Sequence, residues 1–166
     1  IQAFKNVLKH KPDMLDAYNK LGAVLSIQGK HDEALYVYSK GLEKYPNEYS
    51  FYYNMGITLS QTGRFSEAVG AFKKALERKP DEYEICYHLG AALIELGRYD
   101  EAAEAYKSAL NNKPTDSELF YNLSVVYSLL RKRDIALDNL RRAIEINSEL
   151  KSDAKSNKAF DFIKTN

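Results

Sequence analysis

The chain has 166 residues, of which 24 are Lys or Arg and 23 are Asp or Glu, so its net charge is +1. This balance argues against nucleic acid as the main partner, because proteins that bind nucleic acid usually carry a basic excess. The single cysteine excludes an intrachain disulfide. The longest uncharged run, residues 49–63, is too short and too polar to span a bilayer, so we expect no membrane insertion.

Residues 1–11 form the first predicted helix. Its apolar residues Ile1, Phe4 and Val7 recur at the spacing that places them on one helix face. In the register of the repeats that follow, residues 1–14 correspond to the second helix of a repeat whose first helix is absent. We therefore expect an uncovered apolar face here, through which the chain could form a homodimer.

The rest of the chain repeats itself every 34 residues. The four prolines, Pro12, Pro46, Pro80 and Pro114, are spaced at this interval. Small residues keep the same interval in three series, which are Gly22, Gly56 and Gly90, then Gly29, Gly63 and Gly97, then Ala34, Ala68, Ala102 and Ala136. A period of this length is typical of stacked structural repeats. We divide the chain into four full units, 15–48, 49–82, 83–116 and 117–150.

Each unit contains two predicted helices joined by a short turn. In the second unit they cover residues 49–61 and 66–79, and apolar residues three or four positions apart line one side of each. Small residues such as Gly56 and Ala68 face large ones such as Phe72, which lets the two backbones approach closely. The last unit departs from this pattern, because Ser124 and Arg131 stand where the others have glycine.

Short polar residues are predicted to cap the helices, because their side-chain oxygens can accept hydrogen bonds from free backbone amides. The expected caps of the second helices are Asp32, Ser66, Asp100 and Asp134. The expected caps of the first helices follow the prolines and are Asp13, Asn47, Asp81 and Thr115.

This pattern resembles the tetratricopeptide repeat family. In the first unit its signature residues are Tyr18, Leu21, Gly22, Leu25, Ala34, Tyr38 and Pro46. The resemblance implies an all-α fold, a right-handed superhelix (an α-solenoid) of tandem helix-turn-helix repeats, that includes all of residues 1–166. We expect residues 151–166 to form a C-terminal cap that covers the last repeat with Ala154, Phe160, Phe162 and Ile163.

In such a superhelix, equivalent positions of the first helices line the concave surface. Asparagine side chains there can pair with any peptide backbone, and tyrosine rings add apolar area at a low entropy cost. We therefore predict a peptide-binding groove lined by Asn19, Lys20, Tyr53, Asn54, Ile57, Tyr87, His88, Tyr121 and Asn122. Plain stacking between repeats is the alternative role of these residues. The groove is expected to be mildly acidic, which would favour a neutral or basic peptide, because Lys20 is outnumbered there by Asp16, Glu84, Glu95 and Glu118.

Some members of the family clamp the C-terminal carboxylate of chaperone peptides with lysines, asparagines and an arginine on the first helices. Only Asn54 agrees with that set, so the resemblance does not extend to this function. The three histidines are far apart and have no partners at metal-ligand spacing, and no glycine-rich phosphate loop is present. We therefore expect no enzyme activity, no cofactor and no metal site.

Two further features have structural interpretations. Cys86 occupies an aromatic position of its helix, so we expect a small buried side chain rather than a nucleophile. The basic cluster at residues 131–133 is interpreted as a charged hinge.

Our main hypothesis is a protein–protein interaction scaffold that holds an extended segment of a partner protein in its concave groove. Two alternatives stay open: a regulatory or targeting region of a larger enzyme, such as a glycosyltransferase, and a self-association module. The sequence does not identify the compartment, although a cytoplasmic location is favoured.

Overall fold

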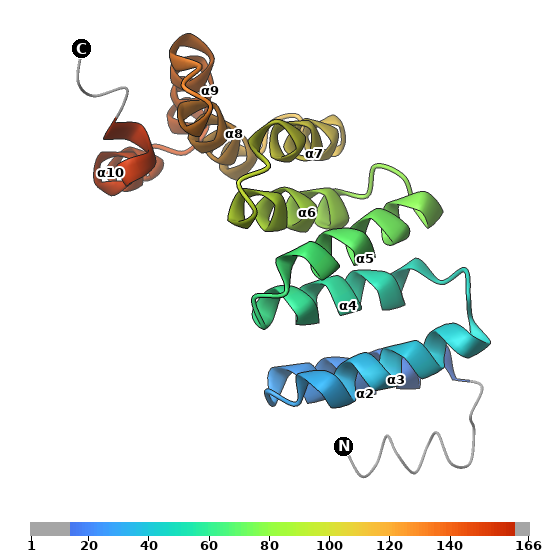
Figure 1. Cartoon of the computed structure of the whole chain (residues 1–166). Helices are drawn as coiled ribbons and strands as arrows, with labels where there is room; N and C mark the ends of the chain where they lie inside the picture. The colour runs from blue at the N-terminus through green and yellow to red at the C-terminus, as the bar shows by residue number, and fades with distance from the viewer. Residues whose placement is uncertain (1–13, 162–166) are drawn as a thin grey trace. The chain divides into compact units, whose positions relative to one another are not determined.

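The structure is a computed structural model, and it describes residues 14–161 of the chain (Figure 1). Helices follow one another throughout this range, and it contains no strand, so the predicted all-α class is confirmed. From α2 to α9, helices of 13 and 14 residues alternate. The helices are α2 (Leu15–Ile27), α3 (His31–Lys44), α4 (Tyr49–Gln61), α5 (Phe65–Arg78), α6 (Tyr83–Glu95), α7 (Tyr99–Asn112), α8 (Ser117–Leu129), α9 (Arg133–Ile146), α10 (Leu150–Ser156) and the 3-10 helix η1 (Lys158–Phe160).

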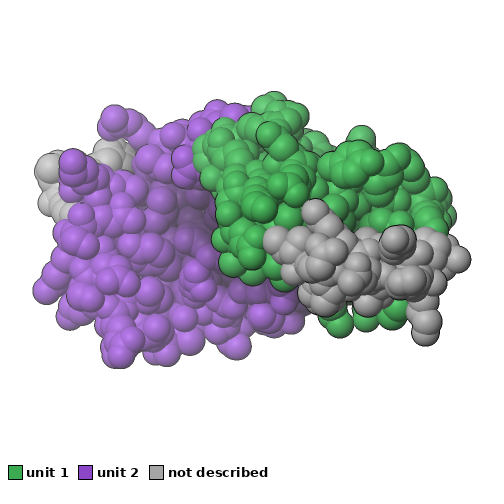
Figure 2. Space-filling model, turned by 90° about the horizontal axis from the view of Figure 1, so that it is seen from below, with its two compact units in different colours: residues 1–80 green, residues 81–166 purple. Residues whose placement is uncertain are grey.

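The chain divides into two compact units, which have different colours in Figure 2. Unit 1 is residues 1–80 and contains α2 to α5, whereas unit 2 is residues 81–166 and contains α6 to α10 and η1. In each unit the two helices of a predicted repeat pack against each other. The organisation of the whole chain as a single solenoid remains a prediction.

The seam within a helix pair consists of a glycine on the first helix and an aromatic ring on the second. Three pairs have this form: Gly22 with Tyr38, Gly56 with Phe72, and Gly90 with Tyr106. A β-carbon added at Gly90 would lie only 2.7 Å from the Tyr106 ring, which is well inside van der Waals contact. Tyr106 itself is 2% exposed. The predicted packing of small against large residues is therefore confirmed in these three pairs.

The turn inside each pair requires a left-handed backbone at one residue. Gly29, Gly63 and Gly97 supply it, with φ angles of 74°, 73° and 69°. Glycine adopts this conformation at no steric cost. In the last pair Arg131 takes the same place with φ of 59°. A side chain with a β-carbon is strained in this region by about 1–2 kcal/mol. The last turn therefore keeps the geometry of the others but at a cost in stability.

The predicted caps of the second helices are wrong. Asp32 and its three equivalents are the second residues of their helices, and the residues before the helices make no side-chain capping bond. The reason is the left-handed turn, which is followed by a single residue before the helix starts. At Asp32 and Asp100, the carboxylates instead lie in the first turn, where they interact favourably with the helix dipole.

The predicted caps of the first helices are also wrong by one residue. Glu48 precedes α4 and accepts a hydrogen bond from the backbone amide of Ser50, and Asp116 caps α8 in the same way. Asp81 has a left-handed φ of 56° and precedes the true cap position. Asp13 lies outside the described residues.

At the C-terminal end of unit 2, Ala154 and Phe160 are buried against Tyr121, Val125 and Leu140. The cap residues Phe162 and Ile163 lie outside the described residues, as does the predicted dimer face at Ile1, Phe4 and Val7. Between residues 14 and 161, none of the helices combines the length and apolarity that crossing a bilayer requires.

Candidate functional site

The predicted binding residues lie on α2 and α4 in unit 1 and on α6 and α8 in unit 2. These are the first helices of the predicted repeats. Eight of the nine side chains are partly buried, and only Lys20 is exposed, where it pairs with Asp16 at 3.9 Å. The predicted residues are therefore surface side chains with one side held by neighbouring residues.

In unit 1 the structure joins Asn19 and Asn54 directly. The Asn54 amide donates to the Asn19 side-chain oxygen at 2.9 Å. The Asn19 amide in turn donates to the hydroxyl of Ser50 at 2.8 Å. This chain of bonds connects α2 with α4 and fixes the orientation of both amide groups.

The Asn54 side chain keeps part of its bonding capacity. A primary amide has two N–H donors and an oxygen with two lone pairs. Among the described residues, only one of its N–H groups has a side-chain partner. Tyr53 and Ile57 lie beside it on α4, and the Tyr53 ring packs 6.2 Å from that of Phe72. Asn54 therefore presents an oriented amide on the same helix as the partly buried Tyr53 and Ile57.

In unit 2 Tyr87 is the centre of the predicted site. Its hydroxyl donates a hydrogen bond to the carboxylate of Glu118, and Asn122 is a partly buried residue of the same helix as Glu118. Burial, together with the bond to Glu118, raises the pKa of Tyr87 to about 12. The Tyr87 ring is 5.3 Å from that of His88 and 6.1 Å from that of Tyr83. Tyr87 is therefore a neutral, oriented aromatic side chain.

The other tyrosine of the predicted groove, Tyr121, contacts the C-terminal part of its own chain. Its ring meets the Phe160 ring edge-on at 5.7 Å, and its hydroxyl accepts a hydrogen bond from the Asn157 amide at 3.0 Å. Tyr121 therefore holds η1 against α8 at the C-terminal end of unit 2.

Ser50 and Glu118 hold the predicted residues in place, and sequence reasoning did not identify this role. They occupy the same position of the 34-residue pattern. Each accepts a hydrogen bond from the preceding first helix, Ser50 from Asn19 and Glu118 from Tyr87. Asn19 and Tyr87 are themselves equivalent positions. The signal was available in the periodic sequence, where a polar residue recurs at this position.

The other titratable groups that the sequence singles out are His88, Cys86 and the basic cluster at residues 131–133. Burial lowers the pKa of His88, which opposes protonation, although the nearby Glu84 acts in the opposite direction. Cys86 is 2% exposed, as expected for a buried side chain, and burial raises the pKa of its thiol to about 11. Across residues 14–161 no group of His, Cys, Asp and Glu side chains has the arrangement of a metal site. In the basic cluster, Lys132 pairs with Asp100 at 3.2 Å.

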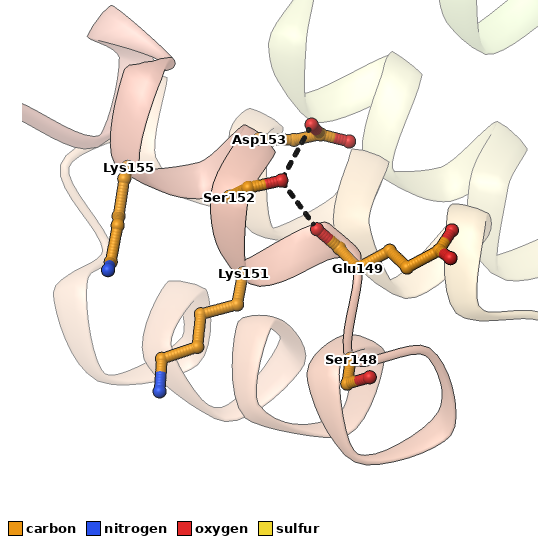
Figure 3. A pocket seen from close by; sticks show the side chains of 6 residues that line it. All are labelled: Ser148, Glu149, Lys151, Ser152, Asp153 and Lys155. Carbon is orange, nitrogen blue, oxygen red and sulfur yellow. Dashed lines mark hydrogen bonds between the residues drawn. The ribbon is translucent and has the colours of Figure 1, made fainter.

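A polar hollow of about 620 Å³ lies beside α10 (Figure 3). It is lined by Ser148, Glu149, Lys151, Ser152, Asp153 and Lys155. The Ser152 hydroxyl donates to the carbonyl of Glu149 at 2.8 Å and lies 3.4 Å from the Asp153 carboxylate. Its two acidic and two basic side chains balance each other, so the hollow selects neither anions nor cations.

Comparison with protein families identifies the repeats. Three family models, each described as a tetratricopeptide repeat, match residues 13–81, 53–117 and 117–150. A comparison with curated protein sequences finds no match.

Solved structures show the same fold. A crystal structure of MamA is 23% identical, with a TM-score of 0.82, and the match covers 91% of this chain and 88% of that one. A fragment of MamA from Desulfovibrio magneticus RS-1 is 20% identical, with a TM-score of 0.77 and 92% of both chains covered. A structure titled MamA AMB-1 is 24% identical, with a TM-score of 0.76, and covers 87% of this chain and 79% of that one.

Proposed function

We propose that this chain, which belongs to the tetratricopeptide repeat family, is a protein-interaction scaffold that binds an extended segment of a partner protein. The binding surface is the face of the first helices that carries the nine predicted residues. In a solenoid of this family that face is concave. The proposal includes no catalytic step.

The observation that carries this proposal is the oriented amide of Asn54. Its bond to Asn19 prevents free rotation, so a peptide that binds to it loses less side-chain entropy than it would with a mobile asparagine. Its remaining donor and acceptor match the N–H and C=O groups of a peptide main chain. Because every peptide offers these groups, Asn54 supports binding without selecting a sequence.

Selectivity is expected from unit 2. The ring of Tyr87 provides apolar area whose fit depends on the size of the peptide side chain that meets it. The carboxylates of Glu84 and Glu118 are exposed beside it, and they favour a neutral or basic segment. Glu118 is already bonded to Tyr87, so a cationic group that approaches Glu118 also meets the tyrosine ring.

A small panel of peptides that differ in charge and side-chain size tests the proposal. Replacing Asn54 with Ala should weaken all peptides alike, by about 1–3 kcal/mol, because a desolvated main-chain group loses its partner. Replacing Tyr87 with Ala should instead change the ranking of the peptides. The variant Glu84→Lys should weaken basic peptides most at low salt, because salt screens exposed charges. Isothermal titration calorimetry measures all three effects.

The control variant is Lys74→Ala, which changes an exposed residue of α5. We expect its affinities to equal those of the unmodified chain. Losses of the same size in the control and in the Asn54 and Tyr87 variants would place the binding surface elsewhere and reject the proposal.

A further inference from the structure

The short helix η1 and its N-cap residue Asn157 lie along the side of α8 that carries Tyr121. The Asn157 amide donates to the Tyr121 hydroxyl at 3.0 Å, and the Phe160 ring meets the Tyr121 ring edge-on at 5.7 Å. Val125, one helical turn after Tyr121, belongs to the same apolar cluster as Phe160. Tyr121 is one of the nine predicted binding residues, and Val125 has the position of Ile57, which is another. The chain therefore places a segment of its own on the α8 part of the predicted face.

A buried hydroxyl of α8 holds the main chain of this segment. Ser128 is 2% exposed, and its hydroxyl donates to the backbone carbonyl of Ala159. The serine at the same position of unit 1, Ser26, donates instead to the side chain of Gln61 on the next first helix, at 2.7 Å. A main-chain carbonyl occurs in every peptide. The α8 site therefore uses the type of contact that binding an extended partner segment requires.

The ring of Phe160 fills an apolar site lined by residues of α8 and α9. Phe160 is 1% exposed, and it packs against Tyr121 and Val125 of α8 and Leu140 of α9. At the position of Leu140 the other second helices have aromatic rings, which are those of Tyr38, Phe72 and Tyr106. The last repeat thus combines a smaller side chain of its own with a ring from outside the repeats. The site therefore fits a large apolar ring.

Few side chains hold this segment in place. Between residues 150 and 161 only Ala154 and Phe160 are buried. Segments with few buried apolar contacts open more readily than the helices of a core. Opening leaves the ring site empty and the Ser128 hydroxyl without its acceptor, which is unfavourable. A partner segment that supplies another ring and another carbonyl restores both contacts, so an exchange of segments keeps the fourth repeat filled.

We propose that η1 is an internal competitor for the partner segment. It occupies the α8 end of the peptide-binding face, and a partner binds there by replacing the ring of Phe160 with an aromatic ring of its own. The partner residue before that ring offers its carbonyl to Ser128, as Ala159 does here. This inference rests on the proposed function, because it takes the face of the nine predicted residues as the binding surface. It adds that the partner segment carries an aromatic residue.

Binding of a synthetic peptide with the sequence of residues 149–166 to the 166-residue chain tests this proposal. In the unmodified chain η1 competes at the high effective concentration of an attached segment, so the peptide should bind weakly. Asn157→Ala removes the bond of η1 to Tyr121 and leaves the site itself intact. This variant should bind the peptide about fivefold more tightly, measured by fluorescence anisotropy of the labelled peptide. Lys158→Ala changes an exposed residue of η1 and should bind the peptide as weakly as the unmodified chain.

Further measurements assign the binding to this site. A peptide with the substitution Phe160→Ala should not bind to the Asn157→Ala chain, because it lacks the ring. Adding Ser128→Ala to that chain should weaken binding of the unmodified peptide about fivefold, since the peptide carbonyl loses its donor. The unmodified peptide should also raise the melting temperature of the Phe160→Ala chain more than that of the unmodified chain. Equal peptide affinities of the unmodified and Asn157→Ala chains would overturn the proposal, because η1 would then not compete.

The panel of peptides described above separates this inference from the proposed function. If η1 competes with partners, Asn157→Ala should bind the panel peptides that contain an aromatic residue more tightly than the unmodified chain does. Losses in Asn54→Ala and Tyr87→Ala without any gain in Asn157→Ala would reject the competitor and leave the scaffold function standing. Exchange of the synthetic peptide alone would also reject it, since η1 would then be a cap that exchanges only with its own sequence. Equal losses in Lys74→Ala would reject the proposed function and the competitor with it.

Discussion

The third and fourth predicted repeats lie in the same unit and keep the same backbone arrangement with different side chains. The third packs Gly90 against the ring of Tyr106. The fourth has Ser124 and Leu140 at the equivalent positions. Ser124 is fully buried, and its hydroxyl donates to the carbonyl of Tyr121 at 2.6 Å. The extra side-chain volume on the first helix therefore coincides with a smaller residue on the second.

This comparison shows that the seam depends on a pair of positions and not on glycine alone. Close packing requires that the volumes of the facing side chains match. The smaller Leu140 also contacts the cap, where Ala154 and Phe160 pack against it. The fourth repeat thus depends on the cap for part of its core. In the third repeat, the second helix α7 packs instead against α8, the first helix of the next repeat.

The largest effect is expected from removing the cap's main apolar contact. Phe160 is 1% exposed, so Phe160→Ala should destabilise unit 2 by about 3–5 kcal/mol through lost burial and a cavity. Urea unfolding followed by circular dichroism measures this loss. Hydrogen exchange should show that α8 and α9 lose more protection than α6 and α7. The control Leu129→Ala changes a residue that is 36% exposed. Equal protection losses in all four helices would show that the fourth repeat has no special dependence on the cap.

A double-mutant cycle can convert the third repeat into the fourth. Gly90→Ser alone should cost about 1–3 kcal/mol, because its β-carbon would collide with the Tyr106 ring. Adding Tyr106→Leu should cost less than the two single changes together, and the difference is the coupling energy of the seam. Chemical denaturation of the four proteins gives this value. Gly70→Ala is the control, because Gly70 has open space around it. Additive effects at Gly90 and Tyr106 would contradict the paired seam.

The smallest effect concerns the turns. Arg131→Gly should stabilise the fourth repeat by up to about 1 kcal/mol, because glycine relieves the strain of the left-handed backbone. The gain is limited because glycine also raises the conformational entropy of the unfolded chain. The reverse exchange, Gly97→Arg, should destabilise the third repeat by about 1–2 kcal/mol. Thermal unfolding of both variants gives the two signs. Changes of the same sign would show that the two turns are not equivalent.

The helix pairs and their seams could be predicted because they repeat. A side chain that recurs every 34 residues, such as Gly56 or Ala68, reveals its structural role through its equivalents. Helix starts were harder, because a short polar residue near a helix end can be a cap or a first-turn residue. Asp32 is of the second kind, since the turn at Gly29 leaves only one residue before α3 begins.

The predicted site illustrates a second limit. Sequence reasoning placed Asn19 and Asn54 on one surface but did not predict their contact. A side-chain amide can pair with many donors and acceptors, so its residue type does not identify its partner. The structure shows that these two amides bond to each other. Tyr121 shows the same limit, since its partners Asn157 and Phe160 lie on a segment whose path does not follow the repeat. The ligand-binding roles of all nine residues stay predictions.

Because Cys86 is buried, the rate at which a thiol reagent labels it reports on the opening of unit 2. The chain has no other thiol, and this one lies on α6, is 2% exposed and has a pKa that burial raises to about 11. A thiol reagent reacts with the thiolate, so the folded state is protected both by the lack of access and by the scarcity of that anion. Labelling must therefore wait for unit 2 to open, and the labelling rate of the unmodified protein records how often that happens.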